Sequence, residues 1–371
     1  MAYIAFRKSV WLIPAVLLAA EGLLALGCSG SAAPTSTATT FTPLTADTTR
    51  ETDPAPSPDG KWIAFTSDRG GHGATQIYLM PAGGGEAKQL THEPDSVRAG
   101  TPSWAPDGKS LLFVSTRGKR YNIYNVNIET GATKQLTHAP GSHRFGCYSS
   151  DGRQIAFYSN RVRPGDLYGF NIFVMGASGE NEDNFARQIT DSKGSPGHPT
   201  WSADMKWVAF VEKDYDSTRQ QTIEGSILFT KYHLFKVSSR GGKEIQLTSG
   251  AVDGQAVEDT WPSWSPDGKW IAFGRQLGTK RDVWILDVAT NRTFPLTTAG
   301  NCIKPTWAWD SKSIYYSSIA ADSTRNEDIW VARDLALKVP PPPKPAAGKA
   351  GAARRGPRAP VRASTPRTTR K

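Results

Sequence analysis

Cysteine is scarce in this sequence, and outside the C-terminal end net charge is absent. Three cysteines in 371 residues exclude a small scaffold stapled by disulfides. The formal net charge of +10 suggests a nucleic-acid-binding protein, but residues 338–371 contain ten Lys and Arg and no acidic residue. The rest of the chain has 34 basic and 34 acidic residues, so the body of the protein is neutral and we expect no nucleic-acid partner.

The N-terminal end has the pattern of an export signal followed by a lipidation site. Arg7 and Lys8 precede an apolar run over residues 10–26, which is short for a membrane span. Cys28 follows a small residue at the end of this run, as in a bacterial lipobox, and residues 29–40 are rich in Ser and Thr. We predict a signal peptide over residues 1–27, lipidation of Cys28 and a tether over residues 28–40. Cleavage without lipidation and an uncleaved anchor are the alternatives.

A phrase of twelve residues recurs six times and defines the body of the protein as a repeat. The fifth copy reads Pro-Ser-Trp-Ser-Pro-Asp-Gly-Lys-Trp-Ile-Ala-Phe, over residues 262–273. The turn aspartates of the six copies are Asp59, Asp107, Asp151, Asp204, Asp267 and Asp310. Their spacings of 48, 44, 53, 63 and 43 residues are typical of β-propeller blades.

Each copy contains four short segments with strand character. The first ends at the Trp of the phrase, Ser-Pro-Asp-Gly forms a tight turn, and the Ile-Ala-Phe run is the second. The third and fourth are runs such as residues 76–80 and the Gln-Leu-Thr phrase of residues 89–91. The sixth copy lacks a fourth segment, and residues 41–45 supply one from the other end of the repeat. We therefore predict an all-β fold, a six-bladed β-propeller of four-stranded blades over residues 41–337, closed by the N-terminal strand.

The aromatic and sulfur-containing residues of the repeats have structural explanations. Most of the twelve tryptophans recur at equivalent positions near the turns or in third strands, so we expect them to pack between blades. Cys147 and Cys302 fall in blades three and six, on opposite sides of the ring. A disulfide requires Cα atoms within about 7 Å, so we expect both thiols to be free.

The blades resemble those of the family of the periplasmic protein TolB. The strings over residues 65–71, 76–80 and 88–91 and the Trp-Ser-Pro-Asp-Gly phrases carry the resemblance, which covers residues 41–335. TolB has an α/β domain before its propeller, through which it meets the inner-membrane partners of the Tol–Pal system, whereas here we expect only the tether. The resemblance implies an exported, non-enzymatic binding scaffold of the cell envelope. Ser29 after Cys28 resembles the sorting context for the outer membrane, so we expect a lipoprotein anchored there, in the periplasm or at the cell surface.

Two classes of enzyme have similar blades. Prolyl oligopeptidases carry an α/β-hydrolase domain after them, but the sequence has no Gly-x-Ser-x-Gly elbow and we expect no hydrolase domain after Leu337, which excludes this class. Oligogalacturonate lyases resemble these propellers and hold a metal with histidines at the channel mouth. A metal-dependent polysaccharide lyase is therefore the alternative function. The histidines map to the loop-rich face or its rim: His72, His92, His138, His143, His198 and His233.

The mouth of the central channel is the expected binding site. The residues just before each inner strand, on the loop-rich face, should surround it: Asp53, Thr101, Phe145, His198, Trp261 and Lys304. Further charged or polar residues should lie near the mouth: Arg98, Arg144, Asp259 and Asn301. The ligand-binding residues that we predict are Asp53, Arg144, His198, Asp259 and Lys304. We expect no catalytic residue, no cofactor and no metal.

The C-terminal segment over residues 338–371 opens with four prolines and continues with Ala, Gly, Pro and basic residues. This composition cannot bury enough apolar surface to fold, so we predict a disordered basic tail, partly in the polyproline II conformation. We expect the tail to contact anionic surfaces such as lipid headgroups. The other partners that we expect are an envelope protein or glycan at the loop-rich face and the membrane, through the lipid anchor. The protein itself should be a monomer.

Overall fold

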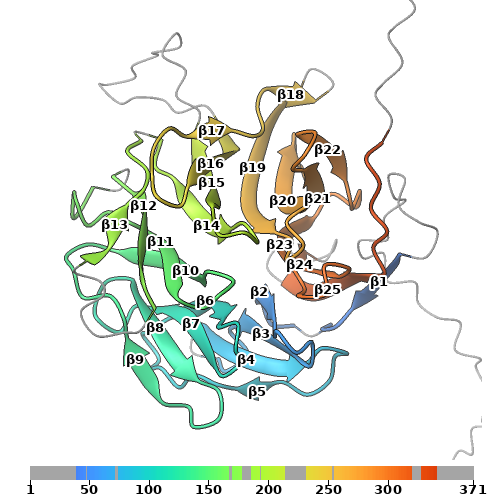
Figure 1. The fold of residues 1–371 in the computed structure, drawn as a ribbon. Coiled ribbons are helices and arrows are strands. Elements are labelled where there is room, and N and C mark those ends of the chain that lie inside the picture. The colour runs from blue at the N-terminus through green and yellow to red at the C-terminus, as the bar shows by residue number, and fades with distance from the viewer. Residues whose placement is uncertain are drawn as a thin grey trace, which may run out of the picture. The chain divides into compact units, whose positions relative to one another are not determined.

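Six antiparallel sheets surround a central axis in the computed structural model of the protein (Figure 1). The structure describes residues 39–46, 48–71, 74–166, 169–177, 185–192, 194–213, 231–252, 255–319 and 327–340. Five of the sheets have four strands, and the fifth along the chain has five. The described residues include no helix of the length and apolarity that a membrane crossing requires. The predicted six-bladed β-propeller is confirmed.

The strands of each blade follow one another from the centre of the ring outward. The innermost strands are β2 (Glu51–Pro56), β6 (Ala99–Trp104), β10 (His143–Tyr148), β14 (Gly197–Trp201), β19 (Gln255–Trp264) and β23 (Cys302–Trp307). The second strands are β3 (Trp62–Ser67), β7 (Ser110–Ser115), β11 (Gln154–Ser159), β15 (Trp207–Lys213), β20 (Trp270–Leu277) and β24 (Ile314–Ile319). The third strands are β4 (Gln76–Pro81), β8 (Asn122–Asn127), β12 (Asn171–Gly176), β16 (Tyr232–Ser238), β21 (Lys280–Asp287) and β25 (Glu327–Arg333). The outermost strands are β5 (Lys88–Gln89), β9 (Thr133–Gln135), β13 (Arg187–Gln188), β17 (Ile245–Gln246), β22 (Arg292–Pro295) and β1 (Thr40–Pro43), and β18 (Ala251–Val252) forms a short hairpin with β19.

The turn between the first and second strands is held by a repeated set of hydrogen bonds. In blade one, Ser57 Oγ donates to Asp59 Oδ1 (2.6 Å) and accepts the backbone N–H of Trp62 (2.9 Å). The hydrogen bond from Ser57 is the main cause that lowers the pKa of Asp59 below its ordinary value. Gly60 has a positive φ of 71°, which glycine adopts without strain. The same serine bonds recur at Ser149, Ser202 and Ser265.

The Gln-Leu-Thr phrase lies mostly after the outermost strand, not in it. Strand β5 ends at Gln89, and Thr91 Oγ1 accepts the backbone N–H of Ile77 in β4 (2.9 Å). The equivalent bonds are made by Thr137, Thr190, Thr248 and Thr297. The fourth strands were therefore predicted one to three residues too late, because the phrase is fixed by a side-chain hydrogen bond and not by strand pairing.

The N-terminal strand closes the ring. Strand β1 pairs with β25 of the last blade, with Phe41 opposite Ala332. Thr45 Oγ1 accepts the N–H of Ile329 (2.9 Å), which is the bond that the phrase threonine makes in the other blades. Phe41 also packs against the core between blades five and six. The N-terminal strand therefore takes the place of the missing outer strand of blade six.

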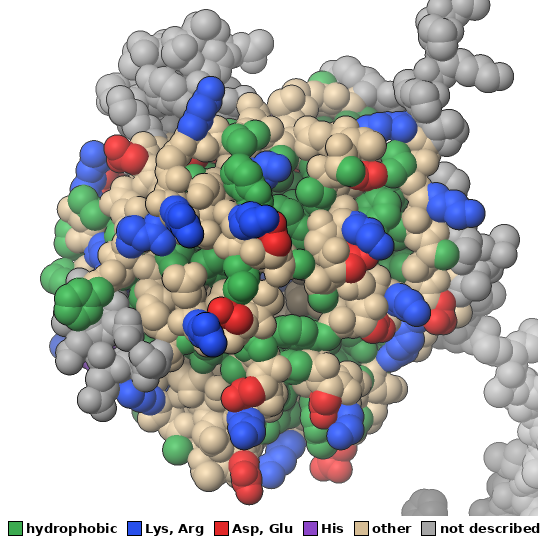
Figure 2. Space-filling model, viewed as in Figure 1, with side chains coloured by type: hydrophobic (Ala, Val, Ile, Leu, Met, Phe, Trp, Pro, Cys, Tyr) green, Lys and Arg blue, Asp and Glu red, His purple; other side chains and the backbone are tan. Residues whose placement is uncertain are grey.

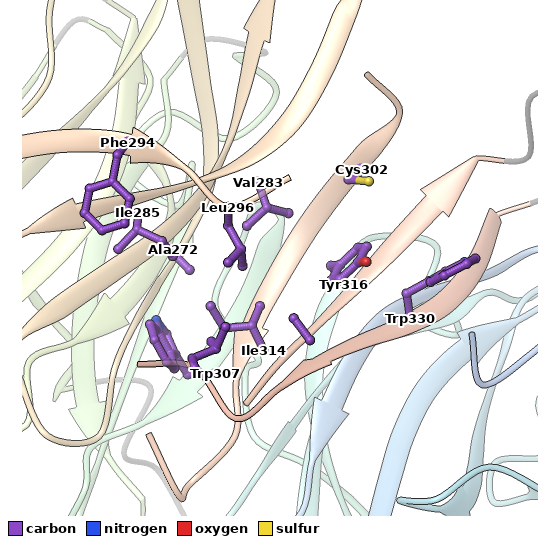
Figure 3. Packing of buried hydrophobic residues seen from close by; sticks show 12 residues of the cluster. Ala272, Val283, Ile285, Phe294, Leu296, Cys302, Trp307, Ile314, Tyr316 and Trp330 are labelled. Carbon is purple, nitrogen blue, oxygen red and sulfur yellow. The ribbon is translucent and has the colours of Figure 1, made fainter. Parts of the chain in front are cut away.

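A hydrophobic cluster fills each of the six interfaces between neighbouring blades. The one between blades five and six includes Phe294, Trp307 and Tyr316 (Figure 3). The cluster that joins the last blade to the first contains Phe65 and Val331, so the closing interface is built like the others. The expected packing role holds for the four tryptophans that precede a turn: Trp104, Trp201, Trp264 and Trp307 are buried.

The two cysteines of the repeats differ. Cys147 is free, as expected, and burial raises the pKa of its thiol to about 12. Cys302 is fully buried and disulfide-bonded, so the expectation of a free thiol is wrong for this residue. The signal peptide, the lipidation of Cys28, the tether up to residue 38 and the tail beyond Pro340 lie outside the described residues.

Candidate binding site

Every innermost strand has a β-bulge at the same position, where its pairing with the second strand is interrupted. One residue of each bulge has a left-handed backbone, with φ between 49° and 55°: Asp53, Thr101, Phe145, His198, Trp261 and Lys304. Proline follows five of them and glycine follows the phenylalanine. Proline has no N–H for the ladder, which favours an interruption there. A left-handed backbone is unfavourable for residues other than glycine, so its sixfold recurrence marks a position where the direction of the side chain matters.

The bulges bring these six side chains together around one cavity of about 210 Å³ in the central channel. We expected them just before the inner strands, but they lie inside, because each strand begins at least one residue earlier. Of the predicted ligand-binding residues, Asp53, His198 and Lys304 line this cavity. Arg144 lines a second cavity beside it.

Asp259 lines neither cavity. It is fully buried, and its two carboxylate oxygens accept hydrogen bonds from Arg275 at 2.6 and 2.9 Å. Burial alone raises the pKa of Asp259, but the hydrogen bonds from Arg275 and His233 hold it below its ordinary value. Residues two positions before the left-handed residue face the blade and not the channel, since Glu51 and His143 are fully buried as well. The prediction assumed a regular inner strand without a bulge, and it therefore placed Asp259 on the wrong side of the strand.

One side of the central cavity is charged. Lys304 Nζ donates to Thr52 Oγ1 (2.6 Å) and lies 3.2 Å from Asp53 Oδ1 and 3.7 Å from Glu327 Oε2. Arg50 Nη2 lies 2.8 Å from Glu327 Oε1. These contacts join blades six and one and hold the Lys304 ammonium in place. Thr52 and Glu327 were not among the predicted site residues.

The opposite side is aromatic. Phe145 stacks on Tyr158 with 5.7 Å between ring centroids and meets His198 edge-on at 4.2 Å. The ring of His198 also meets Trp261 edge-on at 5.9 Å. Burial lowers the pKa of His198 to about 4, so its imidazole is neutral at pH 7. Its Nδ1 is buried and has no hydrogen-bond partner.

The channel continues into a cavity on each side of this ring of six residues. The cavity of about 220 Å³ lies toward the loop-rich ends of blades one to three, where residues such as Thr75 and Arg98 directly precede a strand. The cavity of about 380 Å³ lies toward the turns and is lined by tryptophans and prolines such as Trp104 and Pro266. In Figure 2, hydrophobic side chains surround the central hollow of the face in view, with paired basic and acidic side chains farther out.

The histidines do not gather at the channel. The ring nitrogens of His143 lie 2.9 Å from Ser159 Oγ and 2.9 Å from the Ala139 carbonyl, inside the core. His233 is also buried, so neither of these two side chains is exposed to a ligand. His72 lies outside the described residues. Within the described ranges, no three His, Cys, Asp or Glu side chains are grouped so that they could hold a metal ion.

Comparison with known sequences identifies the family. The TolB beta propeller domain matches residues 95–220. An uncharacterised protein of Agrobacterium fabrum is 31% identical over 264 residues, which are 70% of this chain and 80% of the relative. The chain belongs to the TolB-like β-propeller family.

Solved structures with the same fold include proteins of different names. TolB from Acinetobacter baumannii is 24% identical with a TM-score of 0.56, and the match covers 71% of this chain and 59% of that one. A putative TolB from Agrobacterium tumefaciens is 16% identical with a TM-score of 0.56, covering 81% and 98%. An oligogalacturonate lyase in complex with manganese is 15% identical with a TM-score of 0.50, covering 79% and 92%. At these identities the likeness shows a shared fold.

Proposed function

We propose that this protein is a non-enzymatic binding scaffold of the cell envelope, which holds a partner at the loop-rich face around the central channel. The main support is that the channel residues differ while their surroundings repeat. The bulge recurs in all six blades, but its left-handed position carries Asp, Thr, Phe, His, Trp and Lys in turn. A residue kept for packing between blades would repeat with them. Six different side chains at one level of a concave channel have the composition of a binding site.

The contacts among the groups of the central cavity support binding over catalysis. General acid–base catalysis needs a titratable group within hydrogen-bond reach of the proton that it moves, and a nucleophile needs an adjacent base. Lys304 is held by Asp53 and Glu327, and His198 is neutral and surrounded by aromatic rings. The carboxylate of Asp53, which lines the same cavity, is engaged with the lysine.

The experiment that tests the scaffold is affinity purification of the full chain from envelope extracts, with mass spectrometry of what remains bound. The channel variant is Asp53→Asn with Lys304→Gln, which removes both charges of one ion pair. The matched control is Asp204→Asn with Lys206→Gln, an exposed pair at a turn with 3.5 Å between its charged atoms. We expect one partner to be lost from the channel variant and retained by the control. Equal recovery from both variants would contradict a channel site.

We further propose that the protein is exported and anchored to the outer membrane through a lipid on Cys28. Cys28→Ala should move the protein from the detergent phase of a membrane extract to the aqueous phase, and Cys147→Ala should leave the partition unchanged.

A metal-dependent polysaccharide lyase is the second candidate. His198 favours it, because a neutral imidazole with a free Nδ1 in the channel is the form that binds metals. The described residues do not complete a metal site around it. Elemental analysis of the purified protein and an assay on polygalacturonate separate the two candidates. A stoichiometric divalent ion and cleavage activity, both lost in His198→Ala, would overturn the scaffold.

A further inference from the structure

The cavity on the loop-rich side of the channel has more positive charge than its own residues balance. The cations that line it are Arg50, Arg98, Arg144 and Lys304. Arg50 pairs with Glu327, and Lys304 pairs with Asp53 and Glu327. In the described part of the chain, no carboxylate forms an ion pair with Arg98 or Arg144. The cavity therefore presents two arginines that lack an anionic partner.

Arg144 is held in a fixed orientation with one donor unused. Its guanidinium carbon lies 3.9 Å from the ring centre of Tyr121 and 5.6 Å from that of Phe170. Stacking on a ring leaves the in-plane N–H groups of a guanidinium available as donors. Arg144 Nε is buried without a hydrogen-bond partner, and so is Thr101 Oγ1 in the same cavity. Buried unpaired polar atoms are costly and few in folded proteins, so these two atoms point to an oxygen acceptor that completes the cavity.

We propose that this cavity binds a carboxylate presented by a protein partner, on an acidic side chain or chain end, between Arg98 and Arg144. The inference rests on the proposed scaffold function and specifies the chemistry of the partner. A guanidinium presents N–H donors in a planar fork that matches the two oxygens of a carboxylate. At about 220 Å³, the cavity has the volume of roughly seven waters, which suits a single side chain or a chain end.

The aromatic rings beside the cavity favour a peptide carboxylate over that of an acidic sugar. A sugar stacks on the free face of an aromatic ring. Two aromatic rings line this cavity, those of Tyr121 and Phe145. One face of Phe145 lies against Tyr158, and the guanidinium carbon of Arg144 lies 3.9 Å from the ring centre of Tyr121. With these faces engaged, the cavity offers mainly charge and hydrogen bonds.

The test is a ligand-detected NMR titration of the full chain at constant ionic strength. The probe is the blocked pentapeptide Gly-Gly-Glu-Gly-Gly, compared with its Gln counterpart, with galacturonate and with inorganic phosphate. We expect the Glu peptide to bind, and the Gln peptide to bind at least tenfold more weakly. Arg98→Gln and Arg144→Gln should each weaken binding of the Glu peptide roughly tenfold to hundredfold, the effect of one charge-assisted hydrogen bond. The control is Arg153→Gln, an arginine at a turn with a side chain 86% exposed, which should bind like the parent.

Several results would overturn this inference. The first is equal binding of the Glu and Gln peptides, and the second is unchanged binding of the Glu peptide in both arginine variants. The third is binding of phosphate or galacturonate without binding of the Glu peptide. Binding of galacturonate alone would favour an acidic glycan as the partner. If Arg144→Gln fails to fold, Thr101→Val, which removes the second unpaired atom, should weaken the Glu peptide instead. Failure of the peptide to bind while the partner is still lost from the channel variant would refute the carboxylate and leave the scaffold standing. Absence of any partner would refute the scaffold whatever the peptides do.

Discussion

The turn end and the loop end of the propeller are built by opposite rules. At the turn end, the hydrogen bond from serine to aspartate recurs in four blades with a length of 2.6 to 2.7 Å. Toward the loop end, the six left-handed positions repeat in backbone but in no side chain. Side chains that recur at the same position of the blades stabilise the fold, whereas in the proposed function the six that differ bind the partner. Stability and the proposed binding are then separated along the axis of the propeller.

A third set of residues repeats only in part: in four blades an arginine lies over two aromatic rings of the same blade. Arg69, Arg117, Arg161 and Arg275 each lie over the phenylalanine of the second strand and an aromatic ring of the third, at 4.4 to 5.8 Å. Their hydrogen-bond partners are Glu51, Glu93, His143 and Asp259. The cation is shared by four blades, but its partner changes. Arg275 follows its phenylalanine by two residues in the sequence, whereas the other three arginines follow theirs by four.

Removing the N-terminal strand should have the largest effect, because both ends depend on the closed ring. Deletion of residues 40–45 would free the edge of β25, leave the N–H of Ile329 without its acceptor and uncover the cluster against which Phe41 packs. We expect the thermal midpoint to fall by several degrees, or the protein to aggregate. Thermal unfolding followed by circular dichroism and light scattering measures both. A deletion variant that melts like the parent would show that the ring closes in another way.

Breaking the buried ion pair of blade five should have the next largest effect. Asp259→Ala leaves the Arg275 charge buried without its partner, and such a change costs about 3–5 kcal/mol. The contrast is Arg98→Gln at the loop end, an exposed residue, which should change the free energy of unfolding by less than about 0.5 kcal/mol. Urea denaturation of both variants tests the comparison. Equal losses would mean that the loop end carries as much stability as the blade interior.

Removing one repeated hydrogen bond should cost less. Thr91→Val leaves the N–H of Ile77 unpaired in a buried strand, which we expect to cost about 1–3 kcal/mol in urea denaturation. Thr91→Ser keeps the accepting oxygen and is the matched control. If the serine variant were as unstable as the valine variant, the hydrogen bond would not be the reason for the phrase.

The fold was predictable because the residues that determine it repeat in the sequence. The candidate binding site was less predictable because its residues do not repeat. Six copies of the turn phrase and the displaced strand at residues 41–45 were enough to predict the propeller and its closure. The channel residue of each blade was found from its place before the inner strand. Asp259 was misplaced, because a bulge changes which side of the strand a residue faces, and Pro262, which accompanies the bulge, equally fits the start of a regular strand. Arg98 and Arg144 were expected near the channel mouth, but their sharing one cavity was not predictable, because they come from different blades and different strand positions.

The smallest expected effect is on acid stability, at the turn end. The pKa of Asp59 lies below its ordinary 3.8, first because of the hydrogen bond from Ser57, and the pKa values of Asp151 and Asp204 are lowered in the same way. A carboxylate whose pKa is lower in the folded state stabilises the fold above the unfolded pKa, and this contribution is lost as the pH falls through the folded pKa.

Ser57→Ala should return the pKa of Asp59 toward its ordinary value and so reduce the loss of stability on acidification below about pH 4. The variant should be less stable than the parent at pH 7, and the difference should narrow in acid to the cost of the lost hydrogen bond from the Trp62 N–H. Thermal unfolding from pH 7 to pH 2 measures the difference, with Ser150→Ala as a control, because its hydroxyl contacts the Ala203 carbonyl and no aspartate. Parallel curves for Ser57→Ala and the parent would show that the charge of Asp59 does not contribute to the stability of the fold. The repeated hydrogen bond would then stabilise the turn independently of pH.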